Sequence, residues 1–293
     1  FGGLKRFNGS SYVERVVMKA IKIDVALYAI HTNLDNVHWG VNAKIMEVLG
    51  IKEHQVLSPM GDSLKKFEVY VPVGSEEELA TAVYQAGGGK VSKYEECSFS
   101  VEGTGTFKGT EGTNPVIGEV GVRESVKEMK LEFIVPAFAA KAVERAARAA
   151  HPYEEMAYQW LAVENKATVY GAGAVGELDE AMDFNAFLAH TKKALGTTIK
   201  YTKPVGESVK RVAVCGGSGS FLLGAAMGSG SDVFITADYK YHQFFDADSK
   251  ICIMDVGHFE SEQFTIDLIA DKLSELFPKF AVLKKEVNTN PIQ

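Results

Sequence analysis

The sequence predicts an α/β fold in which one layered domain, residues 1–64 and 165–293, is interrupted by a ferredoxin-like unit, residues 65–164. Helix and strand patterns alternate at both ends of the chain, as they do in layered α/β domains. The central segment instead follows the order βαββαβ, which is typical of ferredoxin-like units. Because exposed loops tolerate inserted domains, one α/β domain that surrounds the central unit accounts for all three segments.

The first segment is predicted to contain two helices and one strand. Ser11 and Glu14 have the spacing of a capping box, and apolar residues follow them at helical intervals. The apolar run 24–30 predicts a buried strand, and residues 40–50 predict a second helix with one apolar face. These three elements form the beginning of the layered domain.

The central unit carries signals for two helices and four strands. Ser75 begins a helix that glycines 87–89 end, and Pro136 begins the second helix, 137–150. A glycine-rich loop is expected between residues 103 and 121. The predicted strands are 67–73, 94–101, 129–135 and 156–163.

The last segment returns to alternating strands and helices. A run of glycine and serine, residues 216–220, follows one predicted strand and precedes a helix of small residues. The predicted strands are 168–172, 211–215, 232–236, 251–255 and 280–287, and the predicted long helices are 183–195 and 261–276.

Composition limits the classes of function. The chain of 293 residues is 46% hydrophobic and has 31 Lys and Arg against 38 Asp and Glu, a net charge of −7 without a basic block, so a nucleic-acid-binding arm is not expected. An apolar run of membrane-spanning length, about 18 residues, is absent from the sequence, so no membrane span is expected. Cys97, Cys215 and Cys252 show no CxxC spacing, which favours a reducing, cytoplasmic compartment.

Polar side chains cluster after three predicted strands, where open α/β sheets bind ligands. In the last cluster, His258 and Glu262 are four residues apart at the start of a helix, so they can face one point. Imidazole and carboxylate together suit zinc, iron or manganese. The alternative is a surface histidine beside a carboxylate that interacts with the helix dipole.

The other two clusters have similar chemistry. Asp35 follows His31 by four residues directly after the predicted strand 24–30, although a simple polar turn is favoured for these residues when they are taken alone. Asp238, Lys240 and His242 follow the strand 232–236. They are candidates for substrate contact or proton transfer, and the alternative is a loop that caps a helix.

Two further motifs have structural alternatives. The glycines of 216–219 lack the third glycine of a dinucleotide fingerprint and the Gly-Lys-Ser/Thr of a P-loop, so close packing of strand and helix is favoured over an NAD-type site. Residues 151–155 contain a histidine, a tyrosine and two carboxylates, and a rigid corner fixed by Pro152 is favoured over a second site.

Three ordered motifs resemble those of the Nif-three-like dinuclear-metal-centre proteins, also named GTP cyclohydrolase I type 2 homologues. The motifs are residues 28–35 (YAIHTNLD), 235–242 (ITADYKYH) and 255–262 (DVGHFESE). Residues 151–155 are similar to the signature of the PII- and CutA-like domain that the long form of this family carries as an insert.

The resemblance implies two divalent metal ions held in part by Asp35, His258 and Glu262. It also implies a histidine pair in a segment upstream of Phe1, so the chain is expected to lack that pair and the first strand and helix of the fold. A ring-shaped homohexamer is the assembly that the resemblance implies.

The resulting expectation is a metal-dependent hydrolase of an unidentified small-molecule substrate, with Asp238, Lys240 and His242 in supporting catalytic roles. GTP ring opening is what the family name implies, although no motif in the chain specifies guanine. The alternative is a non-catalytic protein that senses a metal or a metabolite.

Overall fold

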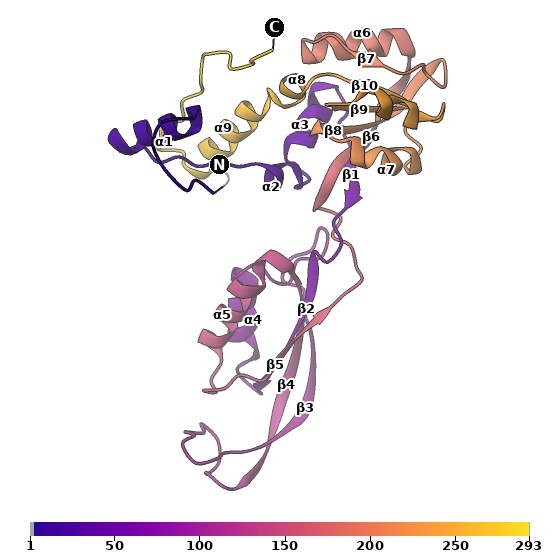
Figure 1. Ribbon diagram of the computed structural model, residues 1–293. Helices are drawn as coiled ribbons and strands as arrows, with labels where there is room; N and C mark the ends of the chain where they lie inside the picture. Colours follow the sequence, from indigo (N-terminus) through magenta and orange to yellow (C-terminus); the bar gives the residue numbers. More distant parts are fainter. Residues whose placement is uncertain (1–2, 293) are drawn as a thin grey trace.

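A computed structural model describes residues 3–292 and shows two β-sheets, each with its own helices (Figure 1). Within these residues the strands form a six-stranded sheet of order β1-β6-β8-β9-β10-β7 and a four-stranded sheet of order β3-β4-β2-β5. The expected loss of an upstream segment concerns the start of the chain and lies outside the described residues.

The six-stranded sheet is the frame of the layered unit. Its centre is parallel, because β8, β9 and β10 run in the same direction, whereas β1, β6 and β7 are antiparallel to their neighbours. The strands are β1 (His54–Pro59), β6 (Gly171–Asp183), β7 (Lys200–Tyr201), β8 (Ser208–Ser218), β9 (Val233–Ala237) and β10 (Cys252–Asp255).

Helices cover both faces of this sheet, and strand residues alternate between two cores. Val212 and Val214 of β8 pack into the core with α3 (Val41–Val48) and α6 (Phe184–Leu195). Ala213 and Cys215 face the other core, with α7 (Leu223–Gly228) and the short helix η3 (Tyr241–Ala247). The first core also includes side chains of α9 (Thr265–Leu276), so the strands are buried on both faces.

The second sheet has the element order β2-α4-β3-β4-α5-β5, which is the βαββαβ order that the sequence predicts. Phe67 and Phe133 face the two helices and are fully buried. On the opposite face, Lys66, Glu68, Lys130 and Glu132 form a continuous set of ion pairs. The elements are β2 (Leu64–Pro72), α4 (Glu76–Gln85), β3 (Phe99–Lys108), β4 (Arg123–Pro136), α5 (Ala140–Ala150) and β5 (Tyr158–Ala162).

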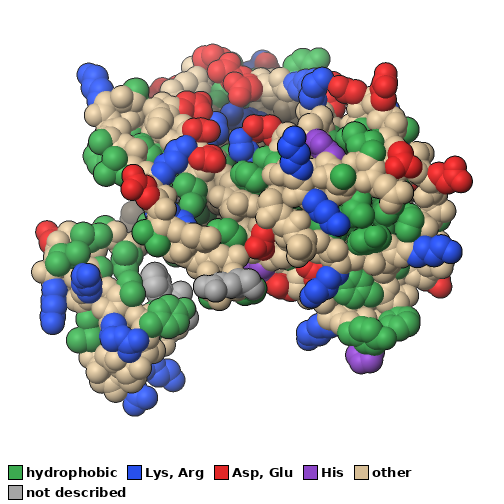
Figure 2. Space-filling view, turned by 90° about the horizontal axis from the view of Figure 1, so that it is seen from above, with side chains coloured by type: hydrophobic (Ala, Val, Ile, Leu, Met, Phe, Trp, Pro, Cys, Tyr) green, Lys and Arg blue, Asp and Glu red, His purple; other side chains and the backbone are tan. Residues whose placement is uncertain are grey.

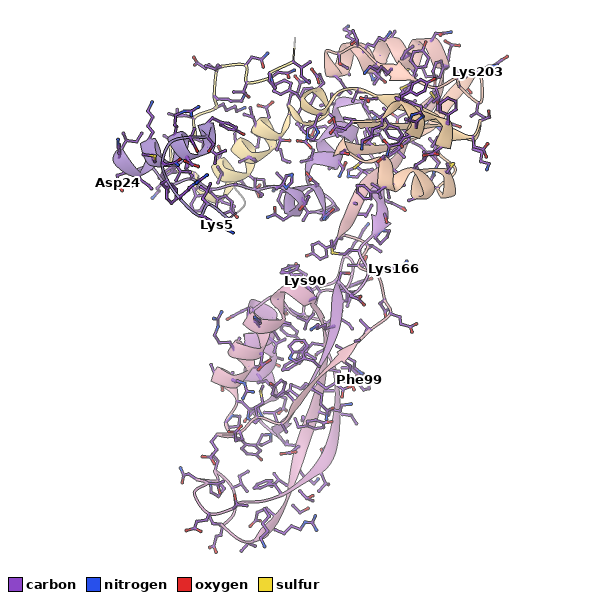
Figure 3. The ribbon with its side chains drawn as sticks, in the orientation of Figure 1. Lys5, Asp24, Lys90, Phe99, Lys166 and Lys203 are labelled. Atoms are coloured by element: carbon purple, nitrogen blue, oxygen red, sulfur yellow. The ribbon has the colours of Figure 1, made fainter. Side chains whose placement is uncertain are left out.

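The connection that leaves the four-stranded unit passes beside α2 (Thr32–Asp35). The backbone amide of Gly171 donates to the carbonyl of Asn36 at 2.9 Å, and Val37 forms an isolated bridge with Tyr170. The Tyr170 ring packs edge-on against Phe138 of the four-stranded unit, with ring centroids 5.5 Å apart. Lys166 lies on this connection (Figure 3).

The predicted strands 24–30 and 280–287 are wrong. Both segments are irregular, and their large apolar side chains, such as Tyr28 and Leu283, are exposed. The physical reason is that a strand needs a neighbour for its backbone hydrogen bonds, and in the described chain neither segment pairs with a strand. The first instead joins α1 (Tyr12–Lys22) to α2.

Several boundaries also differ from the prediction. The strand predicted at 168–172 is the longer β6, because the backbone of β1 approaches its glycines: a Cβ on Gly176 would lie 2.5 Å from the carbonyl oxygen of Glu53. The helix 261–276 is two helices, α8 (His258–Glu262) and α9. The glycine-rich loop is shorter than expected, since β3 continues to Lys108, and β1 and β7 have no counterpart in the prediction.

The helix that Ser11 begins is confirmed, because the Ser11 hydroxyl accepts a hydrogen bond from the Glu14 amide at 3.2 Å.

None of the helices between residues 3 and 292 combines the length and the apolar character needed to cross a membrane. Seen from above, Lys and Arg side chains are interspersed with Asp and Glu on the surface (Figure 2).

We expect Phe67→Ala to destabilise the four-stranded unit by about 3–5 kcal/mol, because it removes a fully buried ring. The Phe67 ring lies 4.6 Å from Trp160 between centroids, so Trp160 fluorescence during urea unfolding, in a Trp39→Phe background, reports this change. Phe99→Ala, on an exposed side chain, is the control and should cost about 0.5 kcal/mol or less. Equal losses in the two variants would contradict the assigned core.

Candidate metal centre

The candidate centre lies where three parallel strands end. Because β8, β9 and β10 are parallel neighbours, their carboxyl ends meet at one edge of the sheet. Asp238 follows β9, and Gly257 leads from β10 into α8, which begins with His258. Gly257 has a φ of 88°, a left-handed conformation that glycine adopts without strain.

His258 contacts a carboxylate through each ring nitrogen. Its Nδ1 lies 2.7 Å from Oδ2 of Asp238, and its Nε2 lies 3.6 Å from Oε2 of Glu262, one turn along α8. The hydrogen bond with Asp238 raises the pKa of His258, and the charges of Glu262 and Asp35 act in the same direction. The imidazole therefore lies within a set of three carboxylates.

Asp255 ties the two strand-end loops together. One oxygen accepts a hydrogen bond from the Tyr239 amide at 3.0 Å, and the other accepts one from the Gly257 amide at 3.1 Å. The residues next to Asp238 and His258 are thus both held by the same partly buried carboxylate.

Asp35 and Glu262 are partly buried carboxyl groups whose charges lie close enough to interact. Burial raises the pKa of both groups, and the charge of Asp35 raises the pKa of Glu262 further. The positive charges of His258 and His31 oppose these shifts. Carboxylates with raised pKa values around an imidazole form an environment that a cation would stabilise.

The buried amide of Asn42 links the Asp35 turn to the sheet. Its Nδ2 donates to the carbonyl oxygen of Asp35, and its Oδ1 accepts from the Gly216 amide, both at 2.9 Å. Sequence patterns do not single out Asn42, because a lone asparagine within a helix has no distinctive signal.

The glycines after β8 make room for the centre. Gly217 has a φ of 62°, and a Cβ at this position would lie 2.5 Å from Oε1 of Glu262 and 3.1 Å from Cε1 of His258. Its amide donates to the Ser261 hydroxyl at 2.9 Å. This contact supports the packing interpretation of the glycine run. Burial also raises the pKa of the adjacent Cys215 to about 12, so its thiol stays protonated.

Within the described residues, the candidate ligands do not form a complete metal site. Among residues 3–292, no three His, Cys, Asp or Glu side chains gather closely enough to hold a metal ion. What the structure brings together is the pair of His258 and Glu262, with Asp238 bonded to the imidazole and Asp35 within electrostatic range. This donor chemistry, one imidazole with carboxylates, fits a divalent cation.

The other predicted site residues lie apart from this pair. Lys240 precedes η3 and His242 lies within it, and both side chains are exposed. The His242 ring packs against the Tyr241 ring, with 5.3 Å between centroids. In the four-stranded unit, His151 is buried, with Nε2 2.7 Å from the Tyr70 carbonyl oxygen, which favours the rigid corner over a second site.

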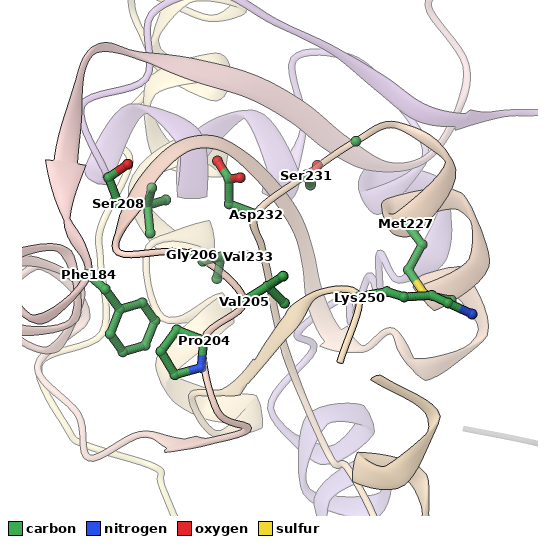
Figure 4. Close-up of a pocket in the computed structure, with 12 residues that line it drawn as sticks. Phe184, Pro204, Val205, Gly206, Ser208, Met227, Ser231, Asp232, Val233 and Lys250 are labelled. Atoms are coloured by element: carbon green, nitrogen blue, oxygen red, sulfur yellow. The ribbon is translucent and has the colours of Figure 1, made fainter. Parts of the chain in front are cut away.

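Two cavities flank the layered unit. One, of about 450 Å³, is lined by His258 and Glu262 together with Phe259, Ile266 and Pro291. The other, of about 260 Å³, lies at the opposite ends of the strands between Phe184, Pro204 and Lys250 (Figure 4). Its one carboxylate, Asp232, already accepts hydrogen bonds from the amides of Lys210 and Arg211.

Fold and site together define a layered α/β protein with an inserted four-stranded unit and a histidine–carboxylate site at its strand ends. Residues 1–291 match the family described as Duf34/NIF3 (NGG1p interacting factor 3), and the chain belongs to this family. It is 38% identical, over 99% of its length and 80% of the relative, to the "GTP cyclohydrolase 1 type 2 homolog" of Bacillus subtilis. The Mycobacterium tuberculosis protein of the same name is 35% identical over 84% of this chain and 67% of the relative.

Solved structures agree with this assignment. A Bacillus cereus protein related to NIF3 superposes with a TM-score of 0.82 at 35% identity, covering 100% of this chain and 80% of the other. A Staphylococcus aureus protein superposes with a TM-score of 0.71 at 27% identity, covering 100% of this chain and 79% of the other. The Nif-three-like fold that the motifs predict is therefore confirmed.

We expect Gly217→Ala to displace the Glu262 carboxylate and the His258 ring, because the new methyl group would occupy their space. Gly230→Ala is a matched control, with a φ of 73° and no atom within 4 Å of the added Cβ. Both variants should lose about 1 kcal/mol or more through backbone strain, measured by urea unfolding. Only Gly217→Ala should shift the NMR signals of the His258 ring, and unchanged signals would refute the contact.

We expect the metal-free protein to gain stability from Glu262→Gln as the pH rises. A carboxyl group with a pKa raised on folding stabilises the fold while protonated and loses that contribution as the pH rises through its folded pKa. Unfolding with a chelator present, from about pH 4.5 to about pH 8, should show a growing advantage for the neutral glutamine.

Glu144→Gln is the control of opposite sign for this series. The hydrogen bond from Tyr158 lowers the pKa of Glu144, so its contribution is present at neutral pH and is lost as the pH falls. This variant should be less stable than the native protein at neutral pH, with a difference that shrinks in acid. Parallel pH profiles for native protein and Glu262→Gln would rule out the assigned burial of Glu262.

Proposed function

We propose that the chain binds two divalent metal ions and acts as a metal-dependent hydrolase. The observation that carries the proposal is the pairing of His258 with Glu262 at the strand ends, with Asp35 within electrostatic range. Membership of the Duf34/NIF3 family and the name of the relatives, GTP cyclohydrolase 1 type 2 homolog, support the same chemistry.

Three side chains of this chain would hold the metal: His258 through Nε2, and Glu262 and Asp35 through their carboxylates. Zinc, iron and manganese all accept this mixture of donors. A bound divalent cation lowers the pKa of a water ligand and polarises a substrate oxygen. Asp35 and Glu262 would then be ionised, because the cation offsets their mutual repulsion.

The remaining predicted residues would act around the substrate, a small molecule whose identity is open within the proposal. Lys240 and His242 belong to the same strand-end loop as Asp238, and their exposed side chains are free to bind a substrate or transfer protons. A cytoplasmic location and a homohexameric ring complete the proposal, and light scattering tests the latter.

A second candidate function is a non-catalytic sensor of a metal or metabolite. It is favoured by the four-stranded unit, since residues 65–164 contribute no described side chain to the candidate centre (Figure 1). A part of the chain that stands apart from the chemistry suits a regulatory role. Tight ligand binding without product formation would select this function.

We expect the purified full-length protein to contain about two divalent metal ions per chain, measured by elemental analysis. His258→Gln and Glu262→Gln should each weaken metal binding at least tenfold, because each removes a donor. Asp267→Asn, which breaks an exposed pair with Lys284, is the control and should leave binding unchanged.

The same proteins should then be assayed on GTP and on a panel of phosphoesters. Metal-dependent turnover that both donor substitutions abolish would establish the hydrolase. Metal binding without turnover would select the sensor, and failure of the native protein to bind any divalent metal would refute both.

A further inference from the structure

We infer that Asp238 is a positioning residue that fixes the tautomer and orientation of His258, so that Nε2 is the atom presented to a metal. The inference rests on the proposed metal-binding function and deepens it. It replaces the expectation that Asp238 contacts the substrate or transfers protons.

The hydrogen bond defines which nitrogen carries the proton. An ionised carboxylate only accepts hydrogen bonds, so at 2.7 Å from Oδ2 of Asp238 the Nδ1 atom of His258 must be the donor. The lone pair of the neutral ring is then on Nε2, which points toward Glu262 at 3.6 Å. A neutral histidine side chain in water prefers the opposite tautomer, with the proton on Nε2, and this tautomer cannot bind a metal through that atom.

The backbone of Asp238 is held in an unusual conformation for this contact. Its φ is 59°, in the left-handed region that costs energy for residues other than glycine, although aspartate tolerates it better than most. The next residue is anchored, because Tyr239 is buried and its amide donates to Asp255. The surroundings therefore impose the conformation that aims the carboxylate at His258.

Asp238 has no competing structural task within residues 3–292. Its carboxylate forms one described hydrogen bond, to His258, and the residue that precedes η3 is Lys240, not Asp238. A helix cap or a loop staple would require a bond to a backbone amide, and Asp255 already fills that role. Carboxylates that orient a metal-binding histidine through its second nitrogen are a general feature of metal sites.

Two substitutions test the inference without disturbing the backbone. Asp238→Gly removes the acceptor and suits the left-handed conformation, and Asp238→Asn keeps a neutral acceptor of the same shape. Asp248→Asn is a matched control, because Asp248 also has a positive φ of 46° and pairs with Lys250, away from His258. Thermal midpoints of all three variants should stay close to that of the native protein.

The first readout is the tautomer of His258 in metal-free protein, from ring nitrogen NMR at a pH above the midpoint of its own titration. The native protein and Asp248→Asn should show the proton on Nδ1. Asp238→Gly should show it mainly on Nε2, and Asp238→Asn should lie between these two. The His258 signals are assigned by their loss in His258→Gln.

The second readout is zinc affinity, measured by competition with a chelating dye. Asp238→Gly should bind zinc about 10–100-fold more weakly than the native protein, with a smaller loss for Asp238→Asn and none for Asp248→Asn. An unchanged tautomer or an unchanged zinc affinity in Asp238→Gly would overturn the inference. If the native protein binds no zinc, the proposed function fails, and the tautomer alone then decides whether Asp238 orients His258.

Discussion

The two hydrogen bonds of Asp255 are the constraint on which the candidate centre depends. They join the loop after β9 to the loop after β10, so the backbone on either side of Asp238 and His258 is held at a set distance. Parallel pairing of β9 with β10 places those loops side by side, and the carboxylate then removes the remaining freedom. The relative positions of Asp238 and His258 are thereby determined by the paired strands β9 and β10 and by Asp255.

Electrostatics around this frame is unbalanced in the protein alone. His258 gathers negative charge from both sides, and burial disfavours the ionised forms of Asp35 and Glu262. Such an arrangement costs stability, which a chain tolerates where a bound cation or substrate restores the balance. Gly217 contributes to the same arrangement, because a side chain at this position would collide with the Glu262 carboxylate and the His258 ring.

Much of this organisation was predictable from sequence, for identifiable reasons. His258 and Glu262 share a helix face because they are four residues apart, and Ser11 has a capping pattern that depends on local bonds alone. Tertiary partners are not local, so the apolar runs 24–30 and 280–287 were mistaken for strands. Most of β6 is not predicted from the sequence, because Gly and Ala have a low strand propensity. These small residues are nevertheless suited to the position, since the backbone of β1 approaches them closely. The role of Asn42 is not predictable from the sequence either, because its hydrogen bond with Gly216 joins segments that are far apart in the chain.

The backbone amide of Gly171 donates to the carbonyl of Asn36 and that of His38 donates to the carbonyl of Val169, which attaches the inserted unit to the layered unit beside α2. These bonds hold the connection that leaves the inserted unit against the residues directly after Asp35. The backbone next to Asp238 and His258 is anchored separately, through Asp255. Asp35 is itself held to β8 through Asn42, so both the inserted unit and the six-stranded sheet contact the turn that carries this carboxylate.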